Sequence, residues 1–321
     1  MQLAKWAGGA GLILAAALAA ALVPSQAGAQ AFPSRPIHVV VPYAAGGQTD
    51  VLARLVGNEI QRLAGQQVIV ENKPGASGVI AVEYVVNSGA DGYSVCFCTP
   101  TNIFMPAILD PTTKFDPVKV MTPVIQLFDA AALIAARPGL PASNLKEAIA
   151  MAKAKPNQLS FASIGTGTKA PYPIELMISM SGAEFNMVSY KGEQPVATDL
   201  LADRVDLGYV SVPTALPNVK AGKLKVVAAI APSRLASLPD VPTVAEAVPG
   251  FEASVFFGLF VPNGTPRAAI DKLNELGAAV VATPAMQERM RAEALFPVAA
   301  KPEAFAARVK ADAERWNKLM K

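Results

Sequence analysis

The sequence predicts an α/β protein of two domains, with the second domain inserted in the first. Strand-like runs alternate with helical patterns over residues 37–99, and the alternation restarts over residues 131–230. The length of 321 residues also fits about two domains. Because the strand and helices after Gly250 complete the first unit, we expect domain 1 to comprise residues 30–126 and 254–321. Domain 2 is then 127–253.

Composition excludes several classes of protein. Hydrophobic residues make up 52% of the chain and charged residues 17%, which is too apolar for a disordered protein. The formal net charge of +3 gives no electrostatic reason to expect nucleic-acid binding. With two cysteines and one histidine, a Cys/His zinc site is not expected, and no cofactor is predicted.

Residues 1–29 have the features of a secretory signal peptide. Lys5 provides a basic start, an apolar run follows from Trp6 to Val23, and Ala27-Gly28-Ala29 fits the small-residue cleavage pattern. A retained membrane anchor is the alternative, since the run approaches the ~20 residues that span a bilayer. We expect removal of residues 1–29 and export to the periplasm.

In the first unit we expect strand 37–42, helix 49–63 with Gly65 as its stop, strand 67–71, helix 78–87 and strand 93–99. Apolar residues recur at helical spacing over 49–63, which is typical of a helix with one buried face. The succession of strand, helix and strand is the pattern of a parallel sheet.

In the second unit we expect strands at 131–137, 158–163, 186–190, 205–210 and 224–230, and helices at 144–154, 173–181, 194–202 and 217–220. Asn144 with Glu147 is an N-cap signature, and Gly182 and Gly222 are stops. Strand 254–261 and helices 266–281, 284–295 and 302–320 follow. The chain should leave domain 1 near Gln126 and return near Ser254, which makes a hinge with a cleft between the domains.

The two cysteines and the histidine are interpreted as structural. Cys96 and Cys98 are two apart on a predicted strand, where Cα atoms lie nearly 7 Å apart at ~3.3 Å per residue. A disulfide at that spacing would strain the backbone, so two small buried thiols are expected. His38 begins an apolar strand and is expected to have a structural role.

The clearest local signal is the bend at 41–50, VPYAAGGQTD. A strand ends, two glycines follow, and a helix begins at Thr49 or Asp50, so free N–H groups and the helix dipole meet at one point. Such a point binds an anion without a basic side chain. Asp50 is alternatively the cap that occupies those N–H groups, and Thr49 then remains a ligand contact.

Two bends in the second unit are candidate partners. Residues 163–172, SIGTGTKAPY, again follow a strand and precede a helix. The two glycine bends could hold one carboxylate, or a ligand with two polar ends, across the cleft. Tyr190 and Lys191 lie at another strand–helix turn, where Lys191 is either a positive charge for an anionic ligand or a surface lysine.

Competing chemistry is limited. Residues 165–170 fit the dinucleotide fingerprint G-x-G-x-x-A, which makes an exported dehydrogenase the rival from another class. Glu184 and Glu193 lie near the required acid, but neither clearly ends the next strand. A nucleophile elbow and a phosphate loop are absent from the sequence. Asp199, Asp203 and Asp206 are interpreted as a solvated helix end rather than a metal site.

Five ordered motifs resemble one family. They are residues 37–50, 71–78 (ENKPGASG), 91–93 (DGY), 190–192 (YKG) and 261–266 (VPNGTP). The chain is similar to the periplasmic receptors of tripartite tricarboxylate transporters, the Bug type, from about Phe32 to its end. The resemblance implies a type II periplasmic-binding-protein fold of two α/β domains that close on a ligand.

The resemblance also implies where a small carboxylate would bind: the first-domain bend, the loop 99–102 and the second-domain bend. Together with the turn at 190–191, the candidate ligand-binding residues are Tyr43, Ala45, Gly46, Gly47, Thr49, Asp50, Thr99, Thr101, Asn102, Ser163, Gly165, Thr166, Gly167, Thr168, Tyr172, Tyr190 and Lys191. The chain departs from the family at Phe256-Phe257 and at 168–171, so the ligand's identity does not carry over.

The sequence therefore predicts a non-enzymatic solute receptor that captures a carboxylate by domain closure and docks on a membrane permease. It is expected to be a monomer with no catalytic residue, cofactor or metal. The dehydrogenase above and a sensor subunit on the same fold remain the alternatives.

Overall fold

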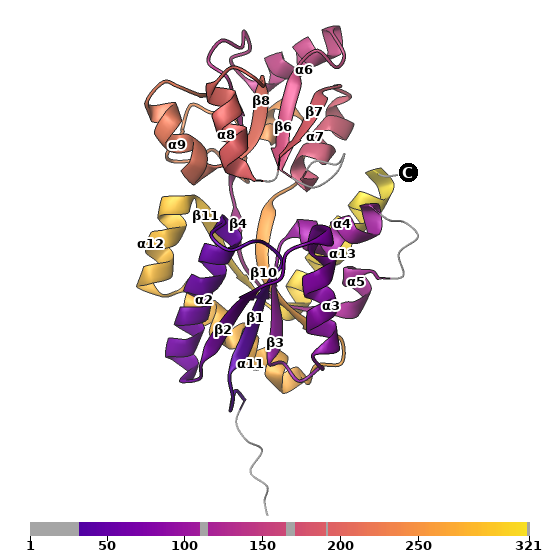
Figure 1. The fold of residues 1–321 in the computed structure, drawn as a ribbon, viewed down its shortest axis with the longest axis vertical. Coiled ribbons are helices and arrows are strands. Elements are labelled where there is room, and N and C mark those ends of the chain that lie inside the picture. The colour runs from indigo at the N-terminus through magenta and orange to yellow at the C-terminus, as the bar shows by residue number, and fades with distance from the viewer. Residues whose placement is uncertain (1–31, 110–114, 165–170, 191, 320–321) are drawn as a thin grey trace, which may run out of the picture.

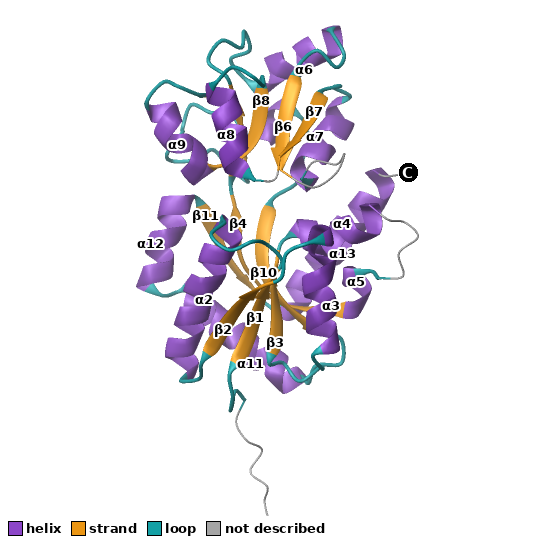
Figure 2. Ribbon diagram, in the orientation of Figure 1, coloured by secondary structure: helices purple, strands orange, loops and turns teal. Residues whose placement is uncertain are grey.

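A computed structural model describes residues 32–109, 115–164, 171–190 and 192–319. These residues form two α/β lobes that follow one another along the long axis of the molecule (Figure 1). Each lobe has one β-sheet with helices packed against it (Figure 2). Within these ranges, no helix is both long and apolar enough to cross a membrane. The expected signal peptide lies outside the described residues.

The first sheet has the strand order β11-β4-β10-β3-β1-β2. Its strands are β1 (Ile37–Val41), β2 (Val68–Asn72), β3 (Ser94–Cys98), β4 (Met121–Ala130), β10 (Val255–Pro262) and β11 (Leu295–Ala300). Strand β1 is parallel to β2 and β3, whereas β10 is antiparallel to β3 and β4. The helices of this lobe are α2 (Gln48–Ala64), η1 (Ala76–Gly78), α3 (Val79–Asn87), α4 (Pro100–Leu109), α5 (Pro117–Val120), α11 (Arg267–Val281), α12 (Pro284–Glu293) and α13 (Pro302–Leu319).

The second sheet has the strand order β7-β6-β8-β5-β9. Its strands are β5 (Ala132–Ala136), β6 (Ser160–Ile164), β7 (Asn186–Tyr190), β8 (Leu207–Ser211) and β9 (Lys225–Ile230). Strand β6 is parallel to β7 and β8, and β5 is antiparallel to β8 and β9. The helices are α6 (Leu145–Ala154), α7 (Tyr172–Ser181), α8 (Glu193–Leu201), α9 (Val212–Lys220) and α10 (Val244–Ala247).

Two crossings join the lobes. The first runs from β4 to β5, and the second returns from α10 to β10. Strand β4 stays paired with β10 and β11 as far as Ala130, so the chain leaves the first sheet later than the Gln126 that the sequence indicated. The return at Ser254 is followed directly by β10. We therefore move the proposed first boundary between the domains to Ala130.

The helices with a strong apolar period form where the sequence predicts them. Helix α2 buries Leu52, Val56 and Ile60, which are spaced at four residues and so share one face. It ends at Gly65, whose φ of 67° is left-handed and whose N–H bonds Gln61 O. Asn144 caps α6 by accepting from Glu147 N, as its sequence signature predicts.

The sequence analysis did not predict two elements that contain proline. Helix α4 follows β3 directly and contains Pro106, which is unusual inside a helix. Strand β11 contains Pro297 and lies at the edge of the sheet, where a strand tolerates a residue without an N–H. The sequence interpretation had continued the preceding helix to residue 295.

The expectation of two free thiols is wrong, because Cys96 and Cys98 form a disulfide. Their Cα atoms are 5.5 Å apart, closer than two residues of a fully extended strand at ~3.3 Å per residue. Strand β3 is therefore contracted at this point, where it lies between β1 and the irregular strand β10. Both cysteines are fully buried. An ideal strand geometry was the wrong basis for excluding the bond.

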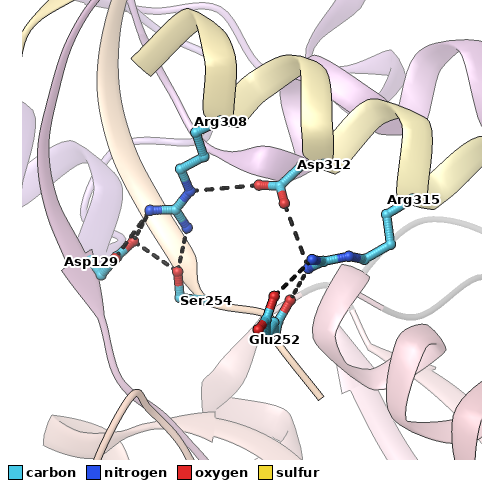
Figure 3. A network of polar contacts seen from close by, with 6 residues as sticks. All are labelled: Asp129, Glu252, Ser254, Arg308, Asp312 and Arg315. Atoms are coloured by element: carbon cyan, nitrogen blue, oxygen red, sulfur yellow. Dashed lines mark hydrogen bonds and ion pairs between the residues drawn. The ribbon is translucent and has the colours of Figure 1, made fainter. Parts of the chain in front are cut away.

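Helix α13 holds the two crossings together (Figure 3). The Arg308 Nη1 donates to both carboxylate oxygens of Asp129, at 3.0 and 3.1 Å, and Nη2 donates to Ser254 Oγ at 2.5 Å. Ser254 Oγ in turn donates to Asp129 Oδ1 at 2.8 Å. About two turns further along α13, Arg315 donates to the backbone carbonyl and to the carboxylate of Glu252, at 2.5 and 2.9 Å. The helix thus contacts both segments that a hinge would use.

Candidate functional site

The carboxyl ends of the parallel strands lie at the edge of each sheet that carries the crossings. In the first sheet, Cys98 at the end of β3 pairs with Gly258 in the first half of β10. In the second, Ser211 at the end of β8 pairs with Ala132 at the beginning of β5. Because β4 leads into β5 and β10 comes back from the second lobe, these two edges face each other. Such edges are where α/β proteins bind ligands.

The first bend lies on this edge, between β1 and α2. Ala45, Gly46 and Gly47 are exposed, and Tyr43 and Thr49 are half-buried. Gly47 is the N-cap of α2 and has no side-chain hydrogen bond that closes the helix end. A Cβ added at Gly46 would have nothing within 4 Å, so the backbone here borders open space. The N–H groups at the start of α2 are therefore accessible, as an anion site requires.

The buried carboxylate of Asp50 stabilises the bend through hydrogen bonds. Its Oδ2 accepts from Gly46 N at 2.9 Å and from Arg54 Nε at 3.1 Å, and its Oδ1 accepts from Asn72 Nδ2 at 2.9 Å. Burial alone would raise the pKa of Asp50, but the hydrogen bonds from Arg54, Gly46 and Asn72 outweigh it and lower the pKa. The carboxylate is 4% exposed and already has donors on both oxygens. Asp50 is therefore placed to shape the loop rather than to contact a ligand.

Three polar side chains form a chain of hydrogen bonds beside the bend. Tyr43 Oη lies 2.7 Å from Thr99 Oγ1, which donates to Asn102 Oδ1 at 3.0 Å. Since Thr99 gives its only hydroxyl proton to Asn102, Tyr43 is the donor to Thr99, and its oxygen is left with acceptor capacity. Thr99 and Asn102 are buried and Thr101 is half-buried. Burial raises the pKa of the Tyr43 phenol, which stays protonated.

A glycine makes this arrangement possible. Asn102 Nδ2 lies 3.4 Å from Ser77 O, and a Cβ at Gly78 would lie 2.7 Å from that nitrogen. Gly78 also has a φ of 101°, which disfavours any other residue. The ENKPGASG motif therefore supports both loops of this edge. Asn72 binds Asp50 in the first bend, and Gly78 leaves room for Asn102 in the loop 99–102.

In the second lobe, the described residues of the predicted glycine bend are Ser163, Ile164, Pro171 and Tyr172, and Ser163 is the polar one at the strand end. It is 1% exposed and lies at the carboxyl end of β6. Gly165, Thr166, Gly167 and Thr168 fall outside the described residues, as does Lys191. Gly192, the N-cap of α8, has nothing within 4 Å of an added Cβ, so this turn also borders open space.

Two tyrosines expected at the ligand are engaged within the protein. Tyr172 is 1% exposed and packs edge-on against Phe104 of α4, with ring centroids 6.5 Å apart. Its phenol lies beside Asp312 and Arg315 of α13, and burial raises its pKa. Tyr172 therefore joins the lobes through packing. It was expected at the ligand because it follows the glycine bend, and that role stays a prediction beside its contacts with α4 and α13.

Tyr190 donates its hydroxyl proton to Asp199 Oδ2 at 2.7 Å. Burial, followed by the Asp199 carboxylate, raises the pKa of Tyr190 to about 12. Asp199 also accepts from Arg204, and Asp206 binds Arg137 at 2.8 Å, so these two acids have separate partners. Over the described ranges, no three His, Cys, Asp or Glu side chains gather as a metal site would require.

The sequence analysis missed the turn between β8 and α9. Glu193 Oε2 accepts from Ser211 Oγ at 2.6 Å and from Thr214 Oγ1 at 2.8 Å, which joins the beginnings of α8 and α9. Tyr209 precedes this turn and is 8% exposed. The sequence does contain a signal for this turn. Ser211 ends a strand, and Pro213 lies in the first turn of the helix that follows, so a strand end is followed by a helix start, as at the first bend.

The acids that a dinucleotide site would need have other partners. Glu184 precedes β7 rather than ending it and accepts from Asn157 Nδ2 at 3.1 Å. Glu193 follows β7 and binds Ser211 and Thr214, as described above. A ribose-binding acid belongs at the end of the strand that follows the glycine loop, so neither residue fits that position.

Comparison with known proteins agrees with this geometry. The family model described as "Tripartite tricarboxylate transporter family receptor" matches residues 52–321. Protein BugT of Bordetella pertussis is 32% identical over 301 residues, which cover 93% of this chain and 92% of BugT. An R. palustris protein solved with adipate is 32% identical, with a TM-score of 0.76, 90% of this chain and 97% of that chain covered.

MatC from Rhodopseudomonas palustris, solved with bound malate, is 29% identical to this chain. The TM-score is 0.77, and the alignment covers 90% of this chain and 100% of MatC. The two facing edges, the matched family model and relatives of more than 30% identity over nearly the whole length lead to one assignment. This chain belongs to the tripartite tricarboxylate transporter receptor family.

Proposed function

We propose that this protein is a periplasmic receptor that binds a small carboxylate between its two lobes and delivers it to the permease of a tripartite transporter. Family membership supports the receptor role. The relatives solved with adipate and with malate support a carboxylate as the ligand. Residues 1–29 would direct export and then be removed.

The observation that carries the proposal is the open start of α2 on the facing edge. Gly46 and Gly47 are exposed, and the end of the helix has no side-chain cap. The unpaired N–H groups and the positive end of the helix dipole favour a carboxylate at this position. Asp50 is held by three donors and so fixes the bend in this open form.

Capture proceeds by a shift between open and closed arrangements of the lobes, without covalent chemistry. A ligand that touches both facing edges binds the closed arrangement more tightly and therefore increases its population. The two crossings at Ala130 and Ser254 supply the hinge, and Arg308 fixes them at one point. The permease then recognises the closed form, in which both lobes present one continuous surface.

A bulky residue at Gly47 tests this function. Gly47 has an ordinary φ of −78°, and an added Cβ would meet only Ala44 O, at 3.8 Å. Gly47→Leu should therefore fold normally while its side chain fills the space before α2. We expect calorimetry of the mature protein against adipate, malate and related acids to detect a ligand. Binding should weaken at least about tenfold in Gly47→Leu, a loss of about 1.4 kcal/mol.

The matched control is Ala202→Leu, an exposed position at the far end of α8. This variant should bind as the parent protein does. Failure of the parent protein to bind any carboxylate, or equal affinity in Gly47→Leu, would contradict the proposed function.

A further inference from the structure

We propose that Arg315 and Glu252 form a releasable latch, which holds the two lobes in the arrangement that a ligand can enter and so opposes their closure. This inference rests on the proposed function and adds to it a device that regulates closure. The latch lies at helix α13 and the return crossing, outside the ligand-binding bends, and none of the sequence motifs indicated it.

The first crossing between the lobes is short. Ala130 still pairs with Val255 in the first sheet, whereas Ala132 already pairs with Ser211 in the second. Only Ala131 lies between these two attachments. A rotation of one lobe relative to the other must therefore bend the chain at this residue and at the return crossing.

The return crossing is almost as short. Phe251 N donates to Val248 O of the second lobe at 3.1 Å, and the Phe251 side chain is buried. Ser254 is bound by Arg308 of the first lobe. The stretch that can bend without breaking either attachment is therefore 252–253.

Arg315 binds this stretch from the first lobe (Figure 3). Its Nη1 donates to the backbone carbonyl of Glu252 at 2.5 Å, and its Nη2 donates to the carboxylate at 2.9 Å. Helix α13 is fixed on the first lobe, because the buried Phe305 packs against Phe256 and Phe260 of β10, with ring centroids 5.2 and 5.0 Å apart. Since Arg315 binds the backbone as well as the side chain, a bend at Glu252 must displace these bonds.

The contact can be released without leaving a buried charge unpaired. Asp312 lies between the two arginines of α13, with Oδ1 3.9 Å from Arg315 Nη1 and Oδ2 3.6 Å from Arg308 Nε (Figure 3). Arg315 therefore has a second acidic partner on its own helix. The Glu252 side chain is 76% exposed, so water hydrates its carboxylate after release. A partly exposed pair of this kind contributes a modest free energy, as a reversible movement requires.

The latch is formed in an arrangement that a ligand can enter. Residues 45–47 of the first bend are exposed. A Cβ added at Gly46 of the first lobe or at Gly192 of the second would have nothing within 4 Å. Closure on a ligand must then overcome the Arg315–Glu252 contact. Removing the contact should favour the closed arrangement, and the apparent Kd falls as the fraction of closed protein rises.

Arg315→Ala is the direct test. Helix α13 should still form, because alanine favours helices and Phe305 and Arg308 keep their contacts. The mature protein and the variant are titrated with adipate, malate and related acids by calorimetry. For the acid that binds the parent protein, we expect the variant to bind at least about threefold more tightly. Loss of a merely structural contact would not tighten binding.

Variants of the partner residue show whether the effect comes from this contact. Glu252→Ala removes the carboxylate and leaves the backbone carbonyl, so it should tighten binding in the same direction but less. The double variant should bind no more tightly than Arg315→Ala alone, since both substitutions remove one interaction. Arg291→Ala, at an exposed position of α12, removes the same charge away from the crossings and should bind as the parent protein does.

The outcomes separate this inference from the proposed function. If the parent protein binds an acid and Arg315→Ala binds it equally or more weakly, the latch is overturned while the receptor function stands. If Arg315→Ala does not fold, the sign of the change in Glu252→Ala decides in the same way, because that side chain is exposed. If the parent protein binds no acid in the panel, the proposed function fails, and this inference fails with it.

Discussion

The carboxylate of Asp50 determines the shape of the bend between β1 and α2. It is nearly inaccessible to solvent, and it accepts hydrogen bonds from Gly46, Arg54 and Asn72. A negative charge this close to an anion site would repel a ligand if it were unpaired, and the Arg54 guanidinium compensates for it. The residue thus contributes to binding through loop geometry and not through contact.

Asp50→Asn tests this role through the pH dependence of stability. The pKa of Asp50 is lowered on folding, so its stabilising effect is present above the ordinary aspartate value of about 4 and is lost as pH falls through the folded value. At pH 7 the variant should be less stable by about 2 kcal/mol. The difference from the parent protein should shrink as pH falls below the ordinary aspartate value and the carboxylate becomes protonated. Urea unfolding at a series of pH values measures both.

The control for this prediction is Asp91→Asn. Asp91 pairs with Arg35 on the surface, and both side chains are about half exposed. A surface pair contributes less than about 1 kcal/mol, so this variant should unfold like the parent protein. A difference between Asp50→Asn and the parent protein that did not depend on pH would argue against a charged Asp50.

At the scale of elements, helix α13 controls how the crossings meet. Its Arg308 contacts Asp129 at the end of β4 and Ser254 just before β10, and its Arg315 contacts Glu252 (Figure 3). The planar guanidinium of Arg308 reaches two partners in fixed directions, which an ammonium group does not do. Helix α13 is therefore part of the proposed hinge.

Arg308→Lys should lower the free energy of unfolding by about 1 to 2 kcal/mol. The charge is retained, but a single nitrogen cannot serve both Asp129 and Ser254 with the same geometry. Urea unfolding of the mature protein gives the number. Arg291→Lys, at an exposed position of α12, is the matched control. An unfolding free energy equal to that of the parent protein would show that the contact is not needed to hold the crossings.

The sequence was sufficient for elements with a strong period and for the first bend, and it failed where tertiary context decides. Helix α2 and its Gly65 stop follow directly from spacing and backbone freedom. The course of β4 through Ala130 depends on its partners β10 and β11, which are far away in the sequence. The Cys96–Cys98 bond likewise depends on a local contraction that an ideal strand does not have.

The candidate site shows the same division. Residues of the first bend lie where the motif indicated, because a strand end and a helix start fix the loop between them. Tyr172 packs against Phe104 of α4 and lies beside Arg315 of α13. The sequence did not indicate these contacts, since alternation along a strand or helix does not tell which face meets the other lobe.

At the scale of the whole molecule, the carboxyl ends of the parallel strands of both lobes lie at facing edges. The first edge carries the open start of α2, and the second carries the ends of β6 and β8. In the proposed function, a ligand that touches both edges binds the closed arrangement more tightly, which would couple occupancy to the shape that a permease recognises.

A crystal structure of the mature protein with its tightest-binding carboxylate tests the central claim most directly. The account predicts density for the acid between the two sheet edges, with one carboxylate within hydrogen-bond distance of the N–H groups that follow Gly47. The other end should lie against the second lobe. Density for the acid on an outer face, or bound to one lobe with the start of α2 left empty, would contradict it.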